Sequence, residues 1–128
     1  MKRTLKLAAT GILLVSSMHV FAADLEDDMD ILAQNLGVVQ TTTDAAKMKI
    51  SLENMRNAAL DAQKSTPPKL DGKSTDSTEM KDYRYGLNVL IGQIDKAMKL
   101  ADEGKITEAH KVAAELKETR NTYHSKYR

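Results

Sequence analysis

The sequence predicts an all-α protein, and within that class an antiparallel up-down-up-down four-helix bundle. Apolar residues recur three and four positions apart through four separate segments, which is typical of helices that pack nearly parallel. No segment alternates apolar and polar residues, so no strand is predicted. Two prolines and six glycines in 128 residues leave long stretches unbroken, which also favours helices.

The N-terminal segment, residues 1–22, has the features of a secretory signal peptide. Basic residues come first, residues 7–15 form an apolar region, and Val20-Phe21-Ala22 is a small-x-small cleavage motif. The apolar stretch is shorter than the roughly 20 residues that a membrane span needs. We therefore expect one domain over residues 23–128, in the periplasm of a Gram-negative cell, with no membrane insertion after cleavage.

The composition excludes several classes of function. The chain has no Cys, which rules out disulfides, iron–sulfur clusters, a thiol nucleophile and covalent c-type haem attachment. Three of the 19 basic residues lie in the leader, so 16 remain against 18 acidic residues, a net charge of −2 that argues against nucleic-acid binding. Nothing resembles a catalytic triad, a paired-carboxylate site or a phosphate loop, so no enzyme is predicted.

The first two helices follow the leader. Apolar positions of the first are Leu25, Met29, Leu32, Leu36 and Val39. Acidic residues 26–28 near its start complement the positive end of the helix dipole. Residues 41–44 break the pattern and offer caps for the second helix. Apolar positions of the second are Ala45, Met48, Leu52, Met55, Ala59 and Ala62.

A polar loop from about residue 64 to residue 77 separates the second helix from the third, which Asp76 or Ser77 can cap. Apolar positions of the third are Met80, Tyr83, Leu87, Leu90, Ile94, Ala97 and Ala101. Gly104 ends it. Apolar positions of the fourth are Ile106, Ala109, Ala113, Leu116, Tyr123 and Tyr127. Gly86, beside the apolar seam, leaves a gap that either admits a bulky ligand or is tolerated slack.

Two histidines remain after the leader, His110 and His124, and both lie on the fourth helix. At about 100° per residue, His124 falls on the shoulder of the apolar stripe and His110 further out, as a surface residue. In this topology the first helix begins where the fourth ends. Met29 then lies about 7.5 Å into the bundle and His124 about 6 Å, so a thioether and an imidazole are expected at one depth.

A thioether and an imidazole together form the axial pair of a low-spin haem. With both axial positions filled, no position is open for oxygen or a substrate, which indicates electron transfer. Copper is an alternative metal, although two ligands make a poor copper site. Met80 lies at the same end of the bundle and is an alternative haem ligand on depth alone. A core methionine is also ordinary packing.

Arg120 lies well inside the apolar stripe of the fourth helix, where a charged group is costly unless it is paired with an anion. Two interpretations are equally supported by its position. Its guanidinium either extends past the tyrosines at the helix end into solvent, or meets the charge of a bound anionic ligand.

The sequence resembles the soluble cytochrome b562 family over the whole of residues 23–128. The matching blocks are residues 23–27, 55–64, 66–70, 79–82, 91–95, 119–124 and 126–128. Members of this family are up-down-up-down four-helix bundles. The resemblance implies an electron carrier with one non-covalently bound haem b, and we expect an unidentified redox protein as its partner. The absence of a second apolar face predicts a monomer.

The resemblance also implies site residues. The axial ligands fall on Met29 and His124, which selects Met29 over Met80, and Arg120 is expected close to the haem. The pocket positions fall on Tyr83, Leu87, Leu32 and Leu36. The family often has Phe at the positions of Tyr83 and Leu87. A buried Tyr83 needs a hydrogen-bond partner, and Leu87 removes an aromatic contact with the porphyrin.

The alternative is a non-enzymatic helical interaction protein of the cell envelope, in which Met29 and His124 are core residues. Such a protein would be equally stable with and without haem, whereas a haem protein is stabilised by a ligand that binds only its native state.

Overall fold

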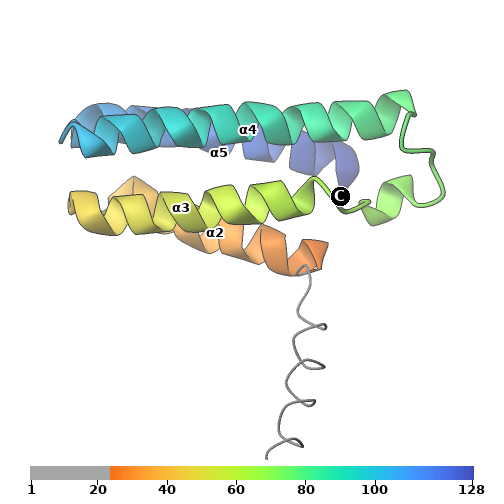
Figure 1. Ribbon diagram of the computed structural model, residues 1–128, viewed down its shortest axis with the longest axis horizontal. Coiled ribbons are helices and arrows are strands. Elements are labelled where there is room, and N and C mark those ends of the chain that lie inside the picture. The colour runs from red at the N-terminus through yellow and green to blue at the C-terminus, as the bar shows by residue number, and fades with distance from the viewer. Residues whose placement is uncertain (1–23) are drawn as a thin grey trace, which may run out of the picture.

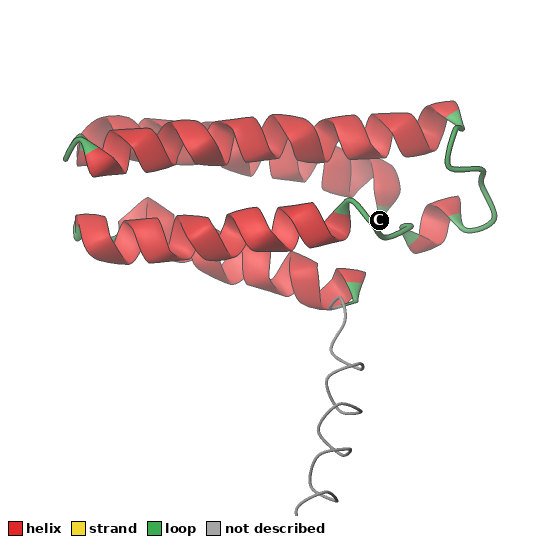
Figure 2. Ribbon diagram, viewed as in Figure 1, coloured by secondary structure: helices red, strands yellow, loops and turns green. Residues whose placement is uncertain are grey.

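The computed structural model describes residues 24–128, so the expected signal peptide lies outside the described residues. The helices are α2 (Leu25–Thr41), α3 (Ala45–Ala62), α4 (Thr78–Asp102) and α5 (Ile106–Tyr127), with a short 3-10 helix η1 (Pro68–Leu70) before α4. The described residues contain no strand (Figure 2), which confirms the predicted all-α class.

The four helices form a closed ring. Each packs against the next in sequence, and α2 also contacts α5, with the smallest of the four contacts. In Figure 1, α4 and α5 form one layer and α2 and α3 the other. The beginning of α2 and the end of α5 lie at the same end of the bundle, as the up-down-up-down prediction requires.

Of the four α-helices, α2, α3 and α4 begin at a short polar side chain that caps the helix, whereas α5 begins without a side-chain cap. Asp24 accepts a hydrogen bond from the amide of Asp27, Asp44 from the amides of Ala46 and Lys47, and Ser77 from the amide of Met80. Each cap satisfies amide groups that have no partner within the helix. Of the two caps expected for α4, Ser77 is the one used.

The α3–α4 connection is less polar than the sequence predicts. Pro67 is fully buried and Leu70 is 5 % exposed, and η1 contacts α5. Proline fixes the backbone angle that a 3-10 turn needs, and the turn directs Leu70 into the core. The loop therefore covers one end of the bundle rather than only spanning it.

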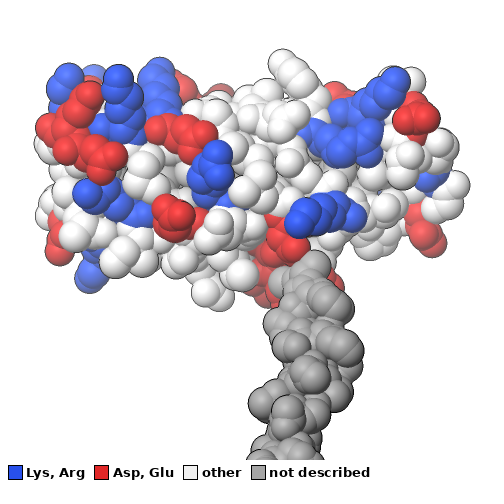
Figure 3. Space-filling view, viewed as in Figure 1, with Lys and Arg blue, Asp and Glu red and all other residues white. Residues whose placement is uncertain are grey.

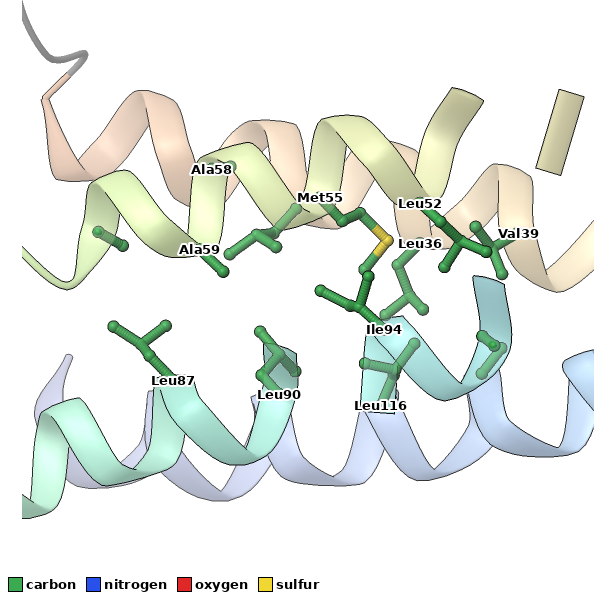
Figure 4. Packing of buried hydrophobic residues seen from close by; sticks show 14 of the residues in the cluster. Leu36, Val39, Leu52, Met55, Ala58, Ala59, Leu87, Leu90, Ile94 and Leu116 are labelled. Atoms are coloured by element: carbon green, nitrogen blue, oxygen red, sulfur yellow. The ribbon is translucent and has the colours of Figure 1, made fainter. Parts of the chain in front are cut away.

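The central core lies between the two layers. In Figure 4, Met55 and Ile94 point toward one another across the bundle, near Leu36 and Leu116. All four side chains are at most 5 % exposed. Burying a side chain of this size stabilises the fold by roughly 1.5–3 kcal/mol.

The end of the bundle remote from the α3–α4 loop carries the short connections and many charges. Gly104, with φ of 75°, takes the left-handed conformation that ends α4. His110, expected on the surface, is half-buried and donates from Nε2 to the Thr42 carbonyl at 2.8 Å, which joins α5 to the α2–α3 turn. Figure 3 shows acidic and basic side chains intermixed at this end.

None of the helices in residues 24–128 is both long enough and apolar enough to cross a membrane.

Candidate functional site

A cavity of about 460 Å³ lies at the end of the bundle where α2 begins and α5 ends. Its walls come from α2, the first half of α4, the last turns of α5 and the proline pair before α4. The volume is in the range of about 300–1,000 Å³ that is usual for small-molecule and cofactor sites.

Met29 and His124 both line this cavity, from opposite ends of the described chain. Both are half-buried. The sequence also allowed Met80 as a haem ligand, because it lies at the same level along the bundle. Its side chain is 3 % exposed in the core and does not line the cavity. The structure therefore brings together the thioether and the imidazole that the sequence pairs.

The environment of His124 favours its neutral form. Burial lowers the pKa of His124 below its ordinary value of 6.5, and the charges of Arg120 and Arg128 lower it further. A neutral imidazole has a free nitrogen lone pair, which is the form that binds a metal.

Arg120 and Arg128 both line the cavity beside His124. Arg120 is half-buried and donates to the Asn121 side chain at 3.2 Å. Within residues 24–128, neither guanidinium has an Asp or Glu carboxylate within ion-pair distance. The cavity thus offers two cations to an anionic group of a ligand.

The predicted pocket residues divide into two groups. Tyr83, Leu87 and Leu32 line the cavity, whereas Leu36 does not and lies in the central core. The hydroxyl of Tyr83 donates to the Ala62 carbonyl at 2.7 Å, which is the partner that a buried tyrosine requires. Burial is the main cause that raises the pKa of Tyr83 to about 12, so the phenol is neutral.

Sequence reasoning did not identify the tyrosines at the end of α5 as wall residues, although it placed them on the apolar stripe. Tyr123 and Tyr127 line the cavity. The Tyr123 ring lies so close to Gly86 that a Cβ there would overlap it. The gap expected at Gly86 is therefore filled by a side chain of α5. Tyr127 packs edge-on against Tyr83, with ring centroids 5.9 Å apart.

Asp28 contradicts the sequence interpretation of the acidic residues near the start of α2. It is only 1 % exposed, and its carboxyl group faces that of Asp61 on α3. Burial, followed by the neighbouring Asp61 carboxyl group and its charge, raises the pKa of Asp28 to about 7. The sequence did not reveal this pair, because helix periodicity does not show which acidic residues meet across two helices.

The fold and the cavity define a class of protein, the four-helix bundle with a cofactor-sized site between facing helices at one end. The family model described as cytochrome b562 matches residues 24–128. The chain belongs to the cytochrome b562 family, whose members are haem-binding electron-transfer proteins.

Two curated relatives come from Yersinia pestis. "Probable soluble cytochrome b562 1" is 55 % identical over 122 residues, which cover 95 % of each chain. "Probable soluble cytochrome b562 2" is 50 % identical over 128 residues, the full length of both chains.

Proposed function

We propose that this protein is a periplasmic electron carrier that binds one haem b per chain without covalent attachment. The iron would be coordinated by the Met29 thioether and the His124 imidazole, as a six-coordinate low-spin centre. The observation that carries this proposal is that these two side chains, far apart in the sequence, line one cavity.

The chemistry of the cavity walls supports a haem. Leu32, Leu87 and Leu90 offer an apolar surface to a porphyrin. Arg120 and Arg128 offer positive charge to its carboxylates. The chain has no Cys, so attachment through thioether bonds is excluded.

The protein's own residues would bind and orient the cofactor and exclude water from its apolar face. A bound haem would supply one-electron exchange at iron, and the soft sulfur of Met29 would favour the reduced state. Two side-chain ligands leave no axial position for a substrate, so we propose a carrier rather than an enzyme. Its redox partner is an unidentified protein, and we propose a monomer.

The location follows from the N-terminal segment. Residues 1–22 have the basic, apolar and small-residue regions of a secretory leader. Removal of this segment would release the bundle into the periplasm.

Ligand replacement tests the assignment with matched controls. Met29→Leu removes the thioether at nearly constant volume, and His124→Ala removes the imidazole. We expect each variant to lose the low-spin absorption spectrum of the haem-loaded protein. Met80→Leu and His110→Ala, which change the same residue types away from the cavity, should retain it. Retention of the low-spin spectrum by both ligand variants would overturn the assignment.

A further inference from the structure

The last turn of α5 is tied to α4 through one carboxylate, that of Asp82. Its Oδ2 accepts a hydrogen bond from the Tyr127 hydroxyl and an ion-paired hydrogen bond from Lys126 Nζ at 3.0 Å. Of the ion pairs within residues 24–128, this is the one that joins α4 to α5.

Aromatic contacts surround this tie. Tyr127 packs edge-on against Tyr83 of α4 and stacks on Tyr123 with ring centroids 6.3 Å apart. Lys126 Nζ lies 4.7 Å from the centroid of the Tyr123 ring. The same lysine therefore links the carboxylate of Asp82 to the aromatic group.

The tie matters because the last turns of α5 carry no fully buried residue and are held to α4 by tyrosine packing and by Asp82. The fully buried residues of α5 end at Leu116, two turns before His124. The last carbonyl groups of a helix have no partner within it, so a helix end without tertiary contacts frays. His124 lies only two and three residues before Lys126 and Tyr127, within the turn that Asp82 holds.

We propose that Asp82 is a positioning residue, which fixes the His124 imidazole in the cavity by holding Lys126 and Tyr127 of the same turn. This inference rests on the proposed function, in which His124 binds the iron. The hydrogen bond from Tyr127, followed by that from Lys126, lowers the pKa of Asp82, so the carboxylate is ionised at neutral pH.

The chain offers a matched control on the same helix. Asp95 of α4 accepts from Arg56 Nε of α3 at 2.8 Å, also as a partly exposed ion pair. Asp95 does not line the cavity and does not contact α5 through an ion pair within the described residues. Asp82→Asn and Asp95→Asn thus remove comparable charges, and only the first loosens the turn that carries His124.

The test uses two measurements on the full bundle. In the haem-free protein, we expect Asp82→Asn to speed amide hydrogen exchange in residues 123–127 by about threefold to tenfold. In the haem-loaded protein, we expect it to speed haem transfer to an excess of a haem-scavenging protein by a similar factor, and to raise the high-spin fraction. Asp95→Asn should change none of these quantities.

Tyr127→Phe keeps the ring and removes the hydroxyl that donates to Asp82. It should therefore change amide exchange and haem transfer in the same direction but by less, and it replaces Asp82→Asn in the test if that variant does not fold. Equal results for Asp82→Asn and Asp95→Asn would overturn the proposal, as would faster amide exchange without faster haem loss. Failure of the proposed function can be told apart from failure of the Asp82 proposal. In the first case the unmodified protein would bind no haem, or His124→Ala would keep the low-spin spectrum.

Discussion

At the scale of single residues, burial decides what each polar group can do. The Tyr83 hydroxyl finds the Ala62 carbonyl and stays neutral. Asp28 has a less favourable environment, because Asp28 Oδ2 and Asp61 Oδ2 are both buried without a hydrogen-bond partner among the described residues. Two ionised carboxylates cannot supply a donor to each other, whereas a proton on Asp28 supplies one.

The raised pKa of Asp28 predicts a pH dependence of stability. The folded state holds the proton up to about pH 7, whereas the unfolded chain releases it near the ordinary value of 3.8. Between these two pH values the folded state therefore binds more protons than the unfolded chain. The free energy of unfolding should consequently fall as the pH rises from about 4 to about 7.

Asp28→Asn tests this prediction, because an amide donates to Asp61 at every pH. In the haem-free protein at pH 8, we expect the variant to be more stable than the unmodified chain by about 1–3 kcal/mol, measured by urea unfolding. At pH 4 the difference should largely disappear. A stability difference that is independent of pH would contradict the assigned pKa.

Helix phase and depth placed Met29 and His124 at one end of the bundle but left Met80 as an alternative ligand, and only the family resemblance selected Met29. The structure places Met29 and His124, and not Met80, in the cavity wall. The burial of Asp28 was not found, since it depends on how α2 and α3 are rotated about their axes. Leu36 was assigned to the pocket by resemblance, yet the structure places it in the central core.

At the scale of elements, α4 and α5 meet at a glycine. The Tyr123 ring occupies the space where a Cβ of residue 86 would lie, so Gly86 allows α5 to approach α4 beside the cavity. Gly92, about two turns further along α4, has no atom within 4 Å of such a Cβ. The two glycines therefore have different roles on one helix.

Alanine substitution at each glycine separates these roles. Gly92→Ala should stabilise the haem-free protein by roughly 0.5–1 kcal/mol, because alanine is the better helix former. Gly86→Ala should destabilise it despite the same propensity gain, by about 1–3 kcal/mol, since the Tyr123 ring must move. Thermal unfolding measures both, and equal shifts for the two variants would contradict the packing described for Tyr123.

The helices were predictable because each has a continuous apolar stripe and most begin at a recognisable cap. The α3–α4 connection was not, because its polar composition hid the burial of Pro67 and Leu70. Whether a loop side chain is buried depends on tertiary contacts, here those of η1 with α5, which no local pattern encodes.

At the scale of the whole molecule, the topology creates the site. The start of α2 and the end of α5 are adjacent only because four helices alternate in direction and the ring closes. The cavity lies at that junction, where the α2–α5 contact is small, and the tyrosines of α5 and the α3–α4 loop form parts of its wall.

The most direct test of the central claim is a haemin titration of residues 23–128, followed by the absorption spectrum after reduction with dithionite. We predict saturation at one haem per chain and sharp, separate α and β bands, because a thioether and an imidazole from one cavity would complete the iron coordination. Absence of a Soret band attributable to bound haem, or a bound haem whose reduced spectrum lacks these sharp bands, would contradict the account.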